Sequence, residues 1–258
     1  MRIVFLGATR FSKEILEHLL SKHIRVTCIF TIPEKFRISY SVKKVKNFNY
    51  ADLGLIAKRH KIKLYQVDSR PGKKIIDHSD VIKKSRPDVI IAAGWYYMIP
   101  KEIRDLAKYG AWGVHASLLP RYAGGAPLVW AMINGEKKAG VTLFRFSDGV
   151  DDGEIICQKS FSIGFEDTIK EVYDKAIVIT KDIIIREIKR VSRTKLKPQD
   201  RSKVEVYPQR FPDDGEIDLN QNALDLYNFI RAQSFPYPGA FIRTKDGKKI
   251  IIEKARIG

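Results

Sequence analysis

Short apolar runs alternate with amphipathic segments along the first part of the chain. The apolar runs are rich in β-branched side chains, as strands are, and occupy residues 2–7, 25–31, 63–67 and 88–96. Between them, residues 12–22 and 50–61 repeat apolar side chains at helical spacing. Strands that alternate with helices form βαβ units, and continuous apolar strands are typical of a parallel sheet covered on both faces.

The later part of the chain predicts fewer and longer elements. Residues 140–146 and 154–163 are strand-like and flank an acidic turn, and residues 166–191 have the apolar period of one long helix. The turn after the first strand-like run, GATRFS at residues 7–12, lacks the G-x-G-x-x-G pattern of dinucleotide-binding turns. We therefore expect an α/β fold with a Rossmann-like, mostly parallel sheet flanked by helices, and no NAD.

A small C-terminal extension of a helix and a hairpin is expected after this sheet. The basic, proline-containing segment at residues 193–203 is the best candidate for a linker. Past it we expect a helix with Asn220 as its N-cap and a hairpin that turns at Asp246 and Gly247. The expected domains are residues 1–192 and residues 193–258.

The composition is that of a soluble globular protein, since 44% of the 258 residues are hydrophobic and 30% are charged. No apolar run approaches the roughly 20 residues of a membrane span, and the N-terminus lacks the layout of a signal peptide. Cys28 and Cys157 lie in strand-like runs, where cysteines are usually buried small hydrophobes rather than disulfide partners. We expect a cytoplasmic protein without a membrane partner.

The formal net charge of +17 is the one unusual feature of the composition. Such a charge attracts tRNA, a nucleotide or a polyglutamylated cofactor, or it belongs to a lysine-rich solvated surface. The lysines are spread along the chain rather than gathered in one tract, which favours the solvated surface.

His115 stands at the start of a loop dense in glycine and proline, AWGVHASLLPRYAGGAPLVW at residues 111–130. Ligands of open parallel sheets bind beyond the carboxyl ends of strands, and we expect both His115 and the acidic turn to follow such ends. An imidazole titrates near neutral pH and can take a proton from an amine, although a core histidine bonded to a backbone carbonyl is the alternative. No two of the five histidines lie at metal-ligand spacing beside Cys, Asp or Glu, so no metal is expected.

Two segments resemble the folate-dependent formyltransferases in order and spacing. They read HASLLPRYAGGAPLVWAMINGE at residues 115–136 and GVTLFRFSDGVDDGEII at residues 140–156. The tail at residues 212–241 is similar to the segment that leads into that family's C-terminal domain. The family includes methionyl-tRNA formyltransferase and enzymes that formylate amino sugars on nucleotide carriers.

The resemblance implies the chemistry of the site. An acceptor amine attacks the formyl carbon of N10-formyltetrahydrofolate through a tetrahedral intermediate. His115 accepts a proton, and Asp151 in the acidic turn orients the imidazole, fixes its tautomer and increases its basicity. The alternative for the acidic turn is a plain solvent turn, because Asp and Gly dominate turns in general.

The same resemblance implies two walls of a folate slot. The acidic turn holds the pterin, so its candidate residues are Ser147, Asp148, Gly149, Val150 and Asp151. The second wall follows the apolar run at residues 88–96 and consists of Tyr97, Met98 and Ile99. The alternative for these three residues is an ordinary hydrophobic strand exit.

Gly113 and Ala123 depart from the family's pattern. Gly113 replaces an asparagine whose amide donates to the developing oxyanion, and Ala123 stands where the family usually has arginine. Losing one oxyanion donor can cost about 10²–10³ in rate. Either a backbone N–H or water takes over in the space at Gly113, or another side chain does, or the protein is slow or only binds folate. A variant active enzyme is favoured, in which Gly113→Asn raises kcat unless the backbone has moved into that space.

Two acceptors fit the resemblance. The chain stops just after one hairpin, a length seen in the sugar enzymes, and GWYYMIP at residues 94–100 is similar to that branch, whereas the net charge favours tRNA. We expect an amino sugar on a nucleotide carrier. The alternatives are methionyl-tRNA, another amine, or a non-catalytic folate- or nucleotide-binding protein, and a homodimer is a further candidate assembly.

Overall fold

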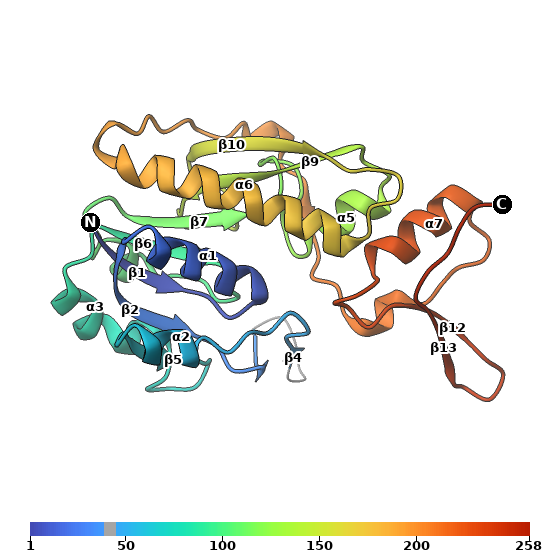
Figure 1. The fold of residues 1–258 in the computed structure, drawn as a ribbon, viewed down its shortest axis with the longest axis horizontal. Coiled ribbons are helices and arrows are strands. Elements are labelled where there is room, and N and C mark those ends of the chain that lie inside the picture. Colours follow the sequence, from blue (N-terminus) through green and yellow to red (C-terminus); the bar gives the residue numbers. More distant parts are fainter. Residues whose placement is uncertain (39–44) are drawn as a thin grey trace.

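A seven-stranded sheet forms the centre of the computed structural model, which describes residues 1–38 and 45–258 (Figure 1). The strand order is β10-β9-β7-β6-β1-β2-β5. These strands are β1 (Arg2–Leu6), β2 (Arg25–Thr31), β5 (Lys63–Gln66), β6 (Val89–Ala93), β7 (Ala111–His115), β9 (Lys138–Arg145) and β10 (Ile155–Ser162).

The sheet is parallel from β7 to β5, and β9 runs antiparallel to both of its neighbours, β7 and β10. The parallel strands are those that the apolar runs predict, because a strand covered on both faces carries few polar side chains. The expected α/β class with a mostly parallel sheet is therefore confirmed.

Helices cover both faces of the sheet. The helices are α1 (Arg10–Ser21), α2 (Gly54–Arg59), α3 (Ser79–Ser85), α4 (Lys101–Arg104), α5 (Pro127–Ile133), α6 (Ile169–Lys189) and α7 (Ala223–Ala232). Leu16 of α1 and Ile183 of α6 are buried in one cluster with Phe5 of the sheet. On the other face, Ile82 of α3 and Ile103 of α4 are buried in a second cluster.

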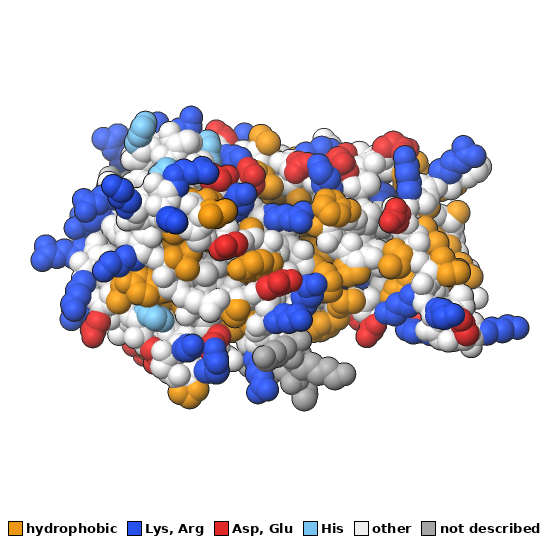
Figure 2. All heavy atoms as spheres, turned by 60° about the horizontal axis from the view of Figure 1, so that its bottom comes forward, with side chains coloured by type: hydrophobic (Ala, Val, Ile, Leu, Met, Phe, Trp, Pro, Cys, Tyr) orange, Lys and Arg blue, Asp and Glu red, His pale blue; other side chains and the backbone are white. Residues whose placement is uncertain are grey.

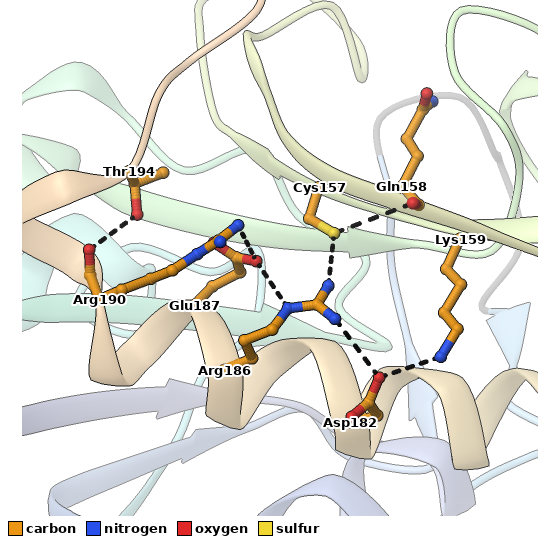
Figure 3. A network of polar contacts seen from close by, with 8 residues as sticks. All are labelled: Cys157, Gln158, Lys159, Asp182, Arg186, Glu187, Arg190 and Thr194. Carbon is orange, nitrogen blue, oxygen red and sulfur yellow. Dashed lines mark hydrogen bonds and ion pairs between the residues drawn. The ribbon is translucent and has the colours of Figure 1, made fainter.

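Helix α6 is the long helix expected over residues 166–191, and it begins at Ile169 and ends at Lys189. Thr168 and Glu171 form a capping box, in which the Glu171 carboxylate accepts the backbone N–H of Thr168 at 2.9 Å. The hydrogen bond from the Thr168 hydroxyl lowers the pKa of Glu171. Near the other end, Arg186 contacts the Cys157 Sγ of β10 at 3.1 Å and the buried Glu187 at 3.3 Å (Figure 3). The contact with Cys157 fastens α6 to β10, whereas Glu187 belongs to α6 itself.

Residues 212–258 lie to one side of the sheet, and their helix α7 packs against α5 (Figure 1). Their hairpin consists of β12 (Ala240–Arg243) and β13 (Lys249–Ile252), as the Asp246–Gly247 turn predicts. The expected N-cap was wrong: Asn222 caps α7 by accepting the N–H of Asp225 at 3.0 Å. Asn220 instead donates its N–H to Asp218 in the preceding turn.

Three short strand pairs and four short 3-10 helices (Ile75–His78, Val191–Arg193, Arg201–Lys203 and Pro212–Gly215) are also present among the described residues. The strand pairs are β3 (Lys35–Phe36) with β4 (Val45–Lys46), β8 (Ala123–Gly124) with β11 (Val206–Tyr207), and the hairpin above. The second predicted helix is shorter than expected, since α2 begins only at Gly54. Among the described residues, no helix is long and apolar enough to cross a membrane.

Candidate active site

His115 is the last residue of β7 and is held between two oxygen atoms. Its side chain is buried, with 8% of the residue exposed. The Nε2 atom lies 2.7 Å from the backbone oxygen of Tyr122, and Nδ1 lies 3.4 Å from Oδ2 of Asp151. The structure therefore brings together the two residues that the sequence predicts to act as a pair.

The Tyr122 carbonyl determines which nitrogen of His115 carries the proton. A carbonyl oxygen only accepts hydrogen bonds, so Nε2 must be the donor at 2.7 Å. In the neutral ring this leaves the Nδ1 lone pair unprotonated and facing Asp151. The carboxylate was expected to fix the tautomer, but the geometry assigns that task to Tyr122.

The loop after His115 is shaped to present this carbonyl. Ser117 Oγ donates to the backbone oxygen of Arg121 at 2.7 Å, and the Arg121 N–H donates to Leu118 at 3.2 Å. Tyr122 itself has a φ of 56°, in the left-handed region. These short-range bonds turn the chain back, so that the carbonyl of residue 122 meets the ring of residue 115.

Asp151 reaches His115 from the opposite direction. The acidic turn follows the carboxyl end of β9, as expected, but β9 is antiparallel to β7, so this end lies beside the start of β7 rather than beside His115. The turn starts beside Ala111, whose carbonyl accepts the N–H of Phe146 at 2.9 Å, and then returns along β7. Asp151 Oδ2 accepts the Gly124 N–H at 2.9 Å, which ties the acidic turn to the His115 loop.

The other residues of the acidic turn mostly contact one another or α4. Ser147 donates to Asp152, and Asp148 forms an ion pair with Arg104 of α4. Val150 is exposed, and a Cβ on Gly149 would meet the Asp152 carboxylate. The turn is therefore ordered in part by its own side chains.

The three residues predicted to form the second wall, Tyr97, Met98 and Ile99, differ in how far they are buried. The Tyr97 hydroxyl donates to the backbone oxygen of Arg37 at 3.0 Å, and burial raises the pKa of Tyr97 to about 12. Met98 is 59% exposed, whereas Ile99 is only 3% exposed and belongs to the cluster around α3 and α4. Tyr97 and Phe146, the residue before the acidic turn, pack against that same cluster. Contact of these residues with folate stays a prediction.

A cavity of about 740 Å³ opens beside the acidic turn, on the side away from His115. Its wall includes Arg104, Trp112, Phe146, Ser147 and Asp148. Arg104 is 8% exposed, and its Nε has no hydrogen-bond partner among the described residues. A buried donor without a partner is a group that a bound polar ligand can satisfy.

The space at Gly113 is filled by aromatic rings. A Cβ at this position would lie 2.5 Å from Cε1 of Phe144 and 2.9 Å from Cε2 of Phe146. Ala123, the second departure from the family's pattern, is buried in the same cluster with Leu119 and Phe144. Both departures therefore border the Phe144 ring. An asparagine side chain at position 113 would overlap these rings, so the structure does not favour the increase in kcat expected from Gly113→Asn.

Sequence reasoning missed three participants in this region. Tyr122 acts through its carbonyl, which any residue could supply, so no sequence signal identifies it. Phe144 was predicted only as part of a strand. The register of β9 against β7 pairs it with Gly113 and thereby places it beside the site. Gln199, in the predicted linker, donates to the backbone of the acidic turn.

Comparisons with known proteins agree with the expected family. The family model "Formyl transferase" matches residues 1–188, and "Formyl transferase, C-terminal domain" matches residues 211–258. Methionyl-tRNA formyltransferase of Thermodesulfovibrio yellowstonii is 31% identical over 97% of this chain and 79% of its own length.

Solved structures share the fold. A sugar N-formyltransferase from a Shewanella species has a TM-score of 0.74 at 18% identity, covering 100% of this chain and 99% of its own. An N-formyltransferase from Helicobacter canadensis, solved with folinic acid and dTDP-3-aminofucose, has a TM-score of 0.66 at 18% identity over 89% of this chain and 79% of its own. The expectation of a folate-dependent formyltransferase is confirmed, and the relatives include both kinds of expected acceptor.

Proposed function

Because the chain belongs to the formyl transferase family, we propose that it moves the formyl group of N10-formyltetrahydrofolate to a primary amine, with an amino sugar on a nucleotide carrier as the acceptor. The observation that carries the transfer chemistry is the placement of His115 between the Tyr122 carbonyl and Asp151. That placement supplies a base of defined tautomer next to a carboxylate.

His115 handles the proton of this reaction. A bond forms between the acceptor nitrogen and the formyl carbon, the bond from that carbon to N10 breaks, and the proton lost by the amine ends on N10. Nδ1 of His115 takes this proton, since Nε2 is already committed to the Tyr122 carbonyl. The protonated ring then has an oxygen partner on both sides, and the Asp151 carboxylate stabilises its charge.

The acidic turn and the segment at residues 97–99 are the proposed folate site. A pterin is flat and has hydrogen-bonding edges, so it requires backbone or side-chain donors beside an apolar wall. The turn at residues 147–150 offers backbone groups, and Phe146, which precedes it, offers an apolar surface. The residues present therefore fit the ligand. When bound, it supplies the formyl group.

The distribution of charge supports a small acceptor. On the face of the described residues drawn in Figure 2, Lys and Arg side chains gather along the left edge, and over the rest of the face they are interspersed with acidic and hydrophobic side chains. A tRNA site requires several neighbouring phosphate contacts. The similarity of residues 94–100 to the sugar enzymes agrees with this choice.

Methionyl-tRNA is the second candidate acceptor. It is favoured by the 31% identity to a methionyl-tRNA formyltransferase over nearly the whole chain, and by the net charge of +17. A salt series separates the two candidates. Binding through many phosphates weakens steeply between about 50 and 200 mM salt, whereas two phosphates give a shallow dependence.

An acceptor panel tests the proposal. The purified protein is incubated with N10-formyltetrahydrofolate and either 3-amino or 4-amino nucleotide sugars or methionyl-tRNA, and the products are identified by mass. An N-acetylated nucleotide sugar, which lacks a free amine, is the matched control. We expect formylation of an amino sugar and none of the control. Efficient formylation of methionyl-tRNA alone would replace the acceptor, and no transfer to any amine would contradict the activity.

A further inference from the structure

The segment expected to be a linker is fastened to both partners of His115. Lys197 pairs with Ile155 at the start of β10 through two backbone bonds of 2.7 and 2.9 Å. Further on, β11 pairs with β8 in the His115 loop, and the Gly125 N–H donates to Tyr207 at 2.9 Å. Residues 197–207 therefore lie along the acidic turn first and the His115 loop second.

Gln199 makes the contact with the acidic turn. Its Nε2 lies 2.7 Å from the backbone oxygen of Asp151 and 2.7 Å from that of Gly153. A side-chain amide has two N–H donors. Both donors therefore bind carbonyl oxygens on either side of Asp152. They hold the backbone at the C-terminal end of the acidic turn.

The backbone of Asp151 needs such support. Its φ of 51° is in the left-handed region, which costs energy for a residue other than glycine. At Gly153 a Cβ would lie 1.6 Å from the Arg145 carbonyl oxygen, so the turn closes tightly against β9. A strained and crowded turn persists only where its surroundings hold it, and the Gln199 amide is a direct holder.

We propose that Gln199 is a positioning residue that keeps the Asp151 carboxylate against Nδ1 of His115. The assignment rests on the proposed function, in which these two residues act as a pair. Gln199 touches no reacting atom. It holds the backbone from which the Asp151 side chain reaches His115 at 3.4 Å and Gly124 at 2.9 Å.

Hydrogen exchange tests the positioning without reference to activity. The Gly124 N–H donates to the Asp151 carboxylate, whereas the next amide, Gly125, donates to Tyr207. Gln199→Met keeps the length of the side chain and removes both donors. We expect it to speed exchange at Gly124 by about 10-fold or more and to leave Gly125 protected. Protection kept at Gly124, or lost equally at both amides, would overturn the assignment.

Kinetics test the effect on the pair. Gln199→Met should lower kcat by about 10-fold, because small misplacements of reacting groups are costly, and leave KM for the folate nearly unchanged. In an Asp151→Asn background the same substitution should change kcat by less than about 2-fold, since the carboxylate it positions is absent. Equal losses in both backgrounds would contradict a role through Asp151.

Gln209→Met is the matched control. Gln209 lies in the same segment, but its amide donates to the backbone of its neighbour Arg210 at 3.3 Å rather than to the acidic turn. This variant should keep the wild-type kcat and the protection of Gly124. If the wild-type protein transferred no formyl group, the proposed function would fail, and the exchange experiment would still decide whether Gln199 positions Asp151.

Discussion

Two neighbouring positions on one face of β7 have opposite surroundings. His115 is enclosed by polar groups from two loops, the Tyr122 carbonyl and the Asp151 carboxylate. Gly113, two residues earlier, is enclosed by the rings of Phe144 and Phe146, with Ala123 in the same apolar cluster. The first region can accept and stabilise a proton, and the second has no polar side chain at the position of the family's asparagine.

The contrast shows that the two tasks of formyl transfer are built independently. The groups that we propose to move the proton are present, whereas the family's oxyanion donor and its arginine are replaced together around Phe144. An aromatic ring in that space excludes water as well as an amide. The donor to the developing oxyanion must therefore come from outside the Phe144 cluster.

Removal of the base should have the largest effect. His115→Asn keeps a hydrogen-bonding side chain of smaller size but cannot take a proton near neutral pH. We expect kcat to fall by at least about 10²-fold, with folate affinity nearly unchanged, because general-base catalysis typically contributes that much. Steady-state kinetics and folate titration measure both quantities. More than half of the activity kept would make His115 a core residue.

Loss of the carboxylate should have a smaller effect. In Asp151→Asn the tautomer is still fixed by Tyr122, so only the stabilisation of the protonated ring is lost. We expect a fall in kcat of about 10-fold, which corresponds to about 1.4 kcal/mol. Asp152→Asn is the control, since Asp152 contacts Ser147 and Arg201 rather than His115. Equal losses in both variants would remove Asp151 from the pair.

An asparagine at position 113 should destabilise the protein instead of restoring a donor. The new side chain overlaps the Phe144 ring, and overpacking of this kind costs about 1–3 kcal/mol. In a chain of this size, each kcal/mol lowers Tm by about 2–4 °C. Calorimetry and kcat are measured on Gly113→Asn.

A second substitution sharpens this test. Phe144→Ala opens the space that the ring occupies, so Gly113→Asn should cost less stability in that background than in the wild type. An increase in kcat for Gly113→Asn alone, at unchanged Tm, would show that the Phe144 ring can move aside. The apolar region around Gly113 could then hold a polar group, which would contradict the contrast with His115.

The smallest effect is expected at the Tyr122 side chain. His115 contacts the carbonyl of this residue and not its hydroxyl, which bonds to Glu136 and Asn134. Burial raises the pKa of Tyr122 to about 12, so the hydroxyl stays protonated at any working pH. Tyr122→Phe should change kcat by less than about 3-fold and leave the pH–rate profile unaltered. A change above 10-fold would assign the hydroxyl a role.

The sequence predicts local elements well and long-range contacts poorly. The period of α6 and the turn at Asp246–Gly247 are visible in neighbouring residues, and the continuous apolar strands predict the parallel sheet. The direction of β9 cannot be predicted from the sequence, because the pattern of apolar and polar residues in a strand is the same whether it runs parallel or antiparallel to its neighbour. That direction places the start of the acidic turn beside the start of β7, a placement that the sequence pattern does not contain.

The site itself was predictable where a motif existed. His115 and Asp151 follow from the resemblance, and the structure brings them together. The Tyr122 carbonyl, the Phe144 ring at Gly113 and the Gln199 amide have no motif, because each depends on a register or on a contact between distant segments. The boundary placed after residue 192 stays a prediction, and the segment that follows it contacts the site rather than merely joining two parts.

The central claim is that Nδ1 of His115 is the nitrogen that receives the proton. It is tested by the ¹⁵N resonances of the His115 ring in selectively labelled protein, at a pH where the ring is neutral, with the His115→Asn spectrum as the assignment. We predict a protonated Nε2, held by the Tyr122 carbonyl, and an unprotonated Nδ1. A protonated Nδ1 that donates to Asp151, with a bare Nε2, would contradict the claim.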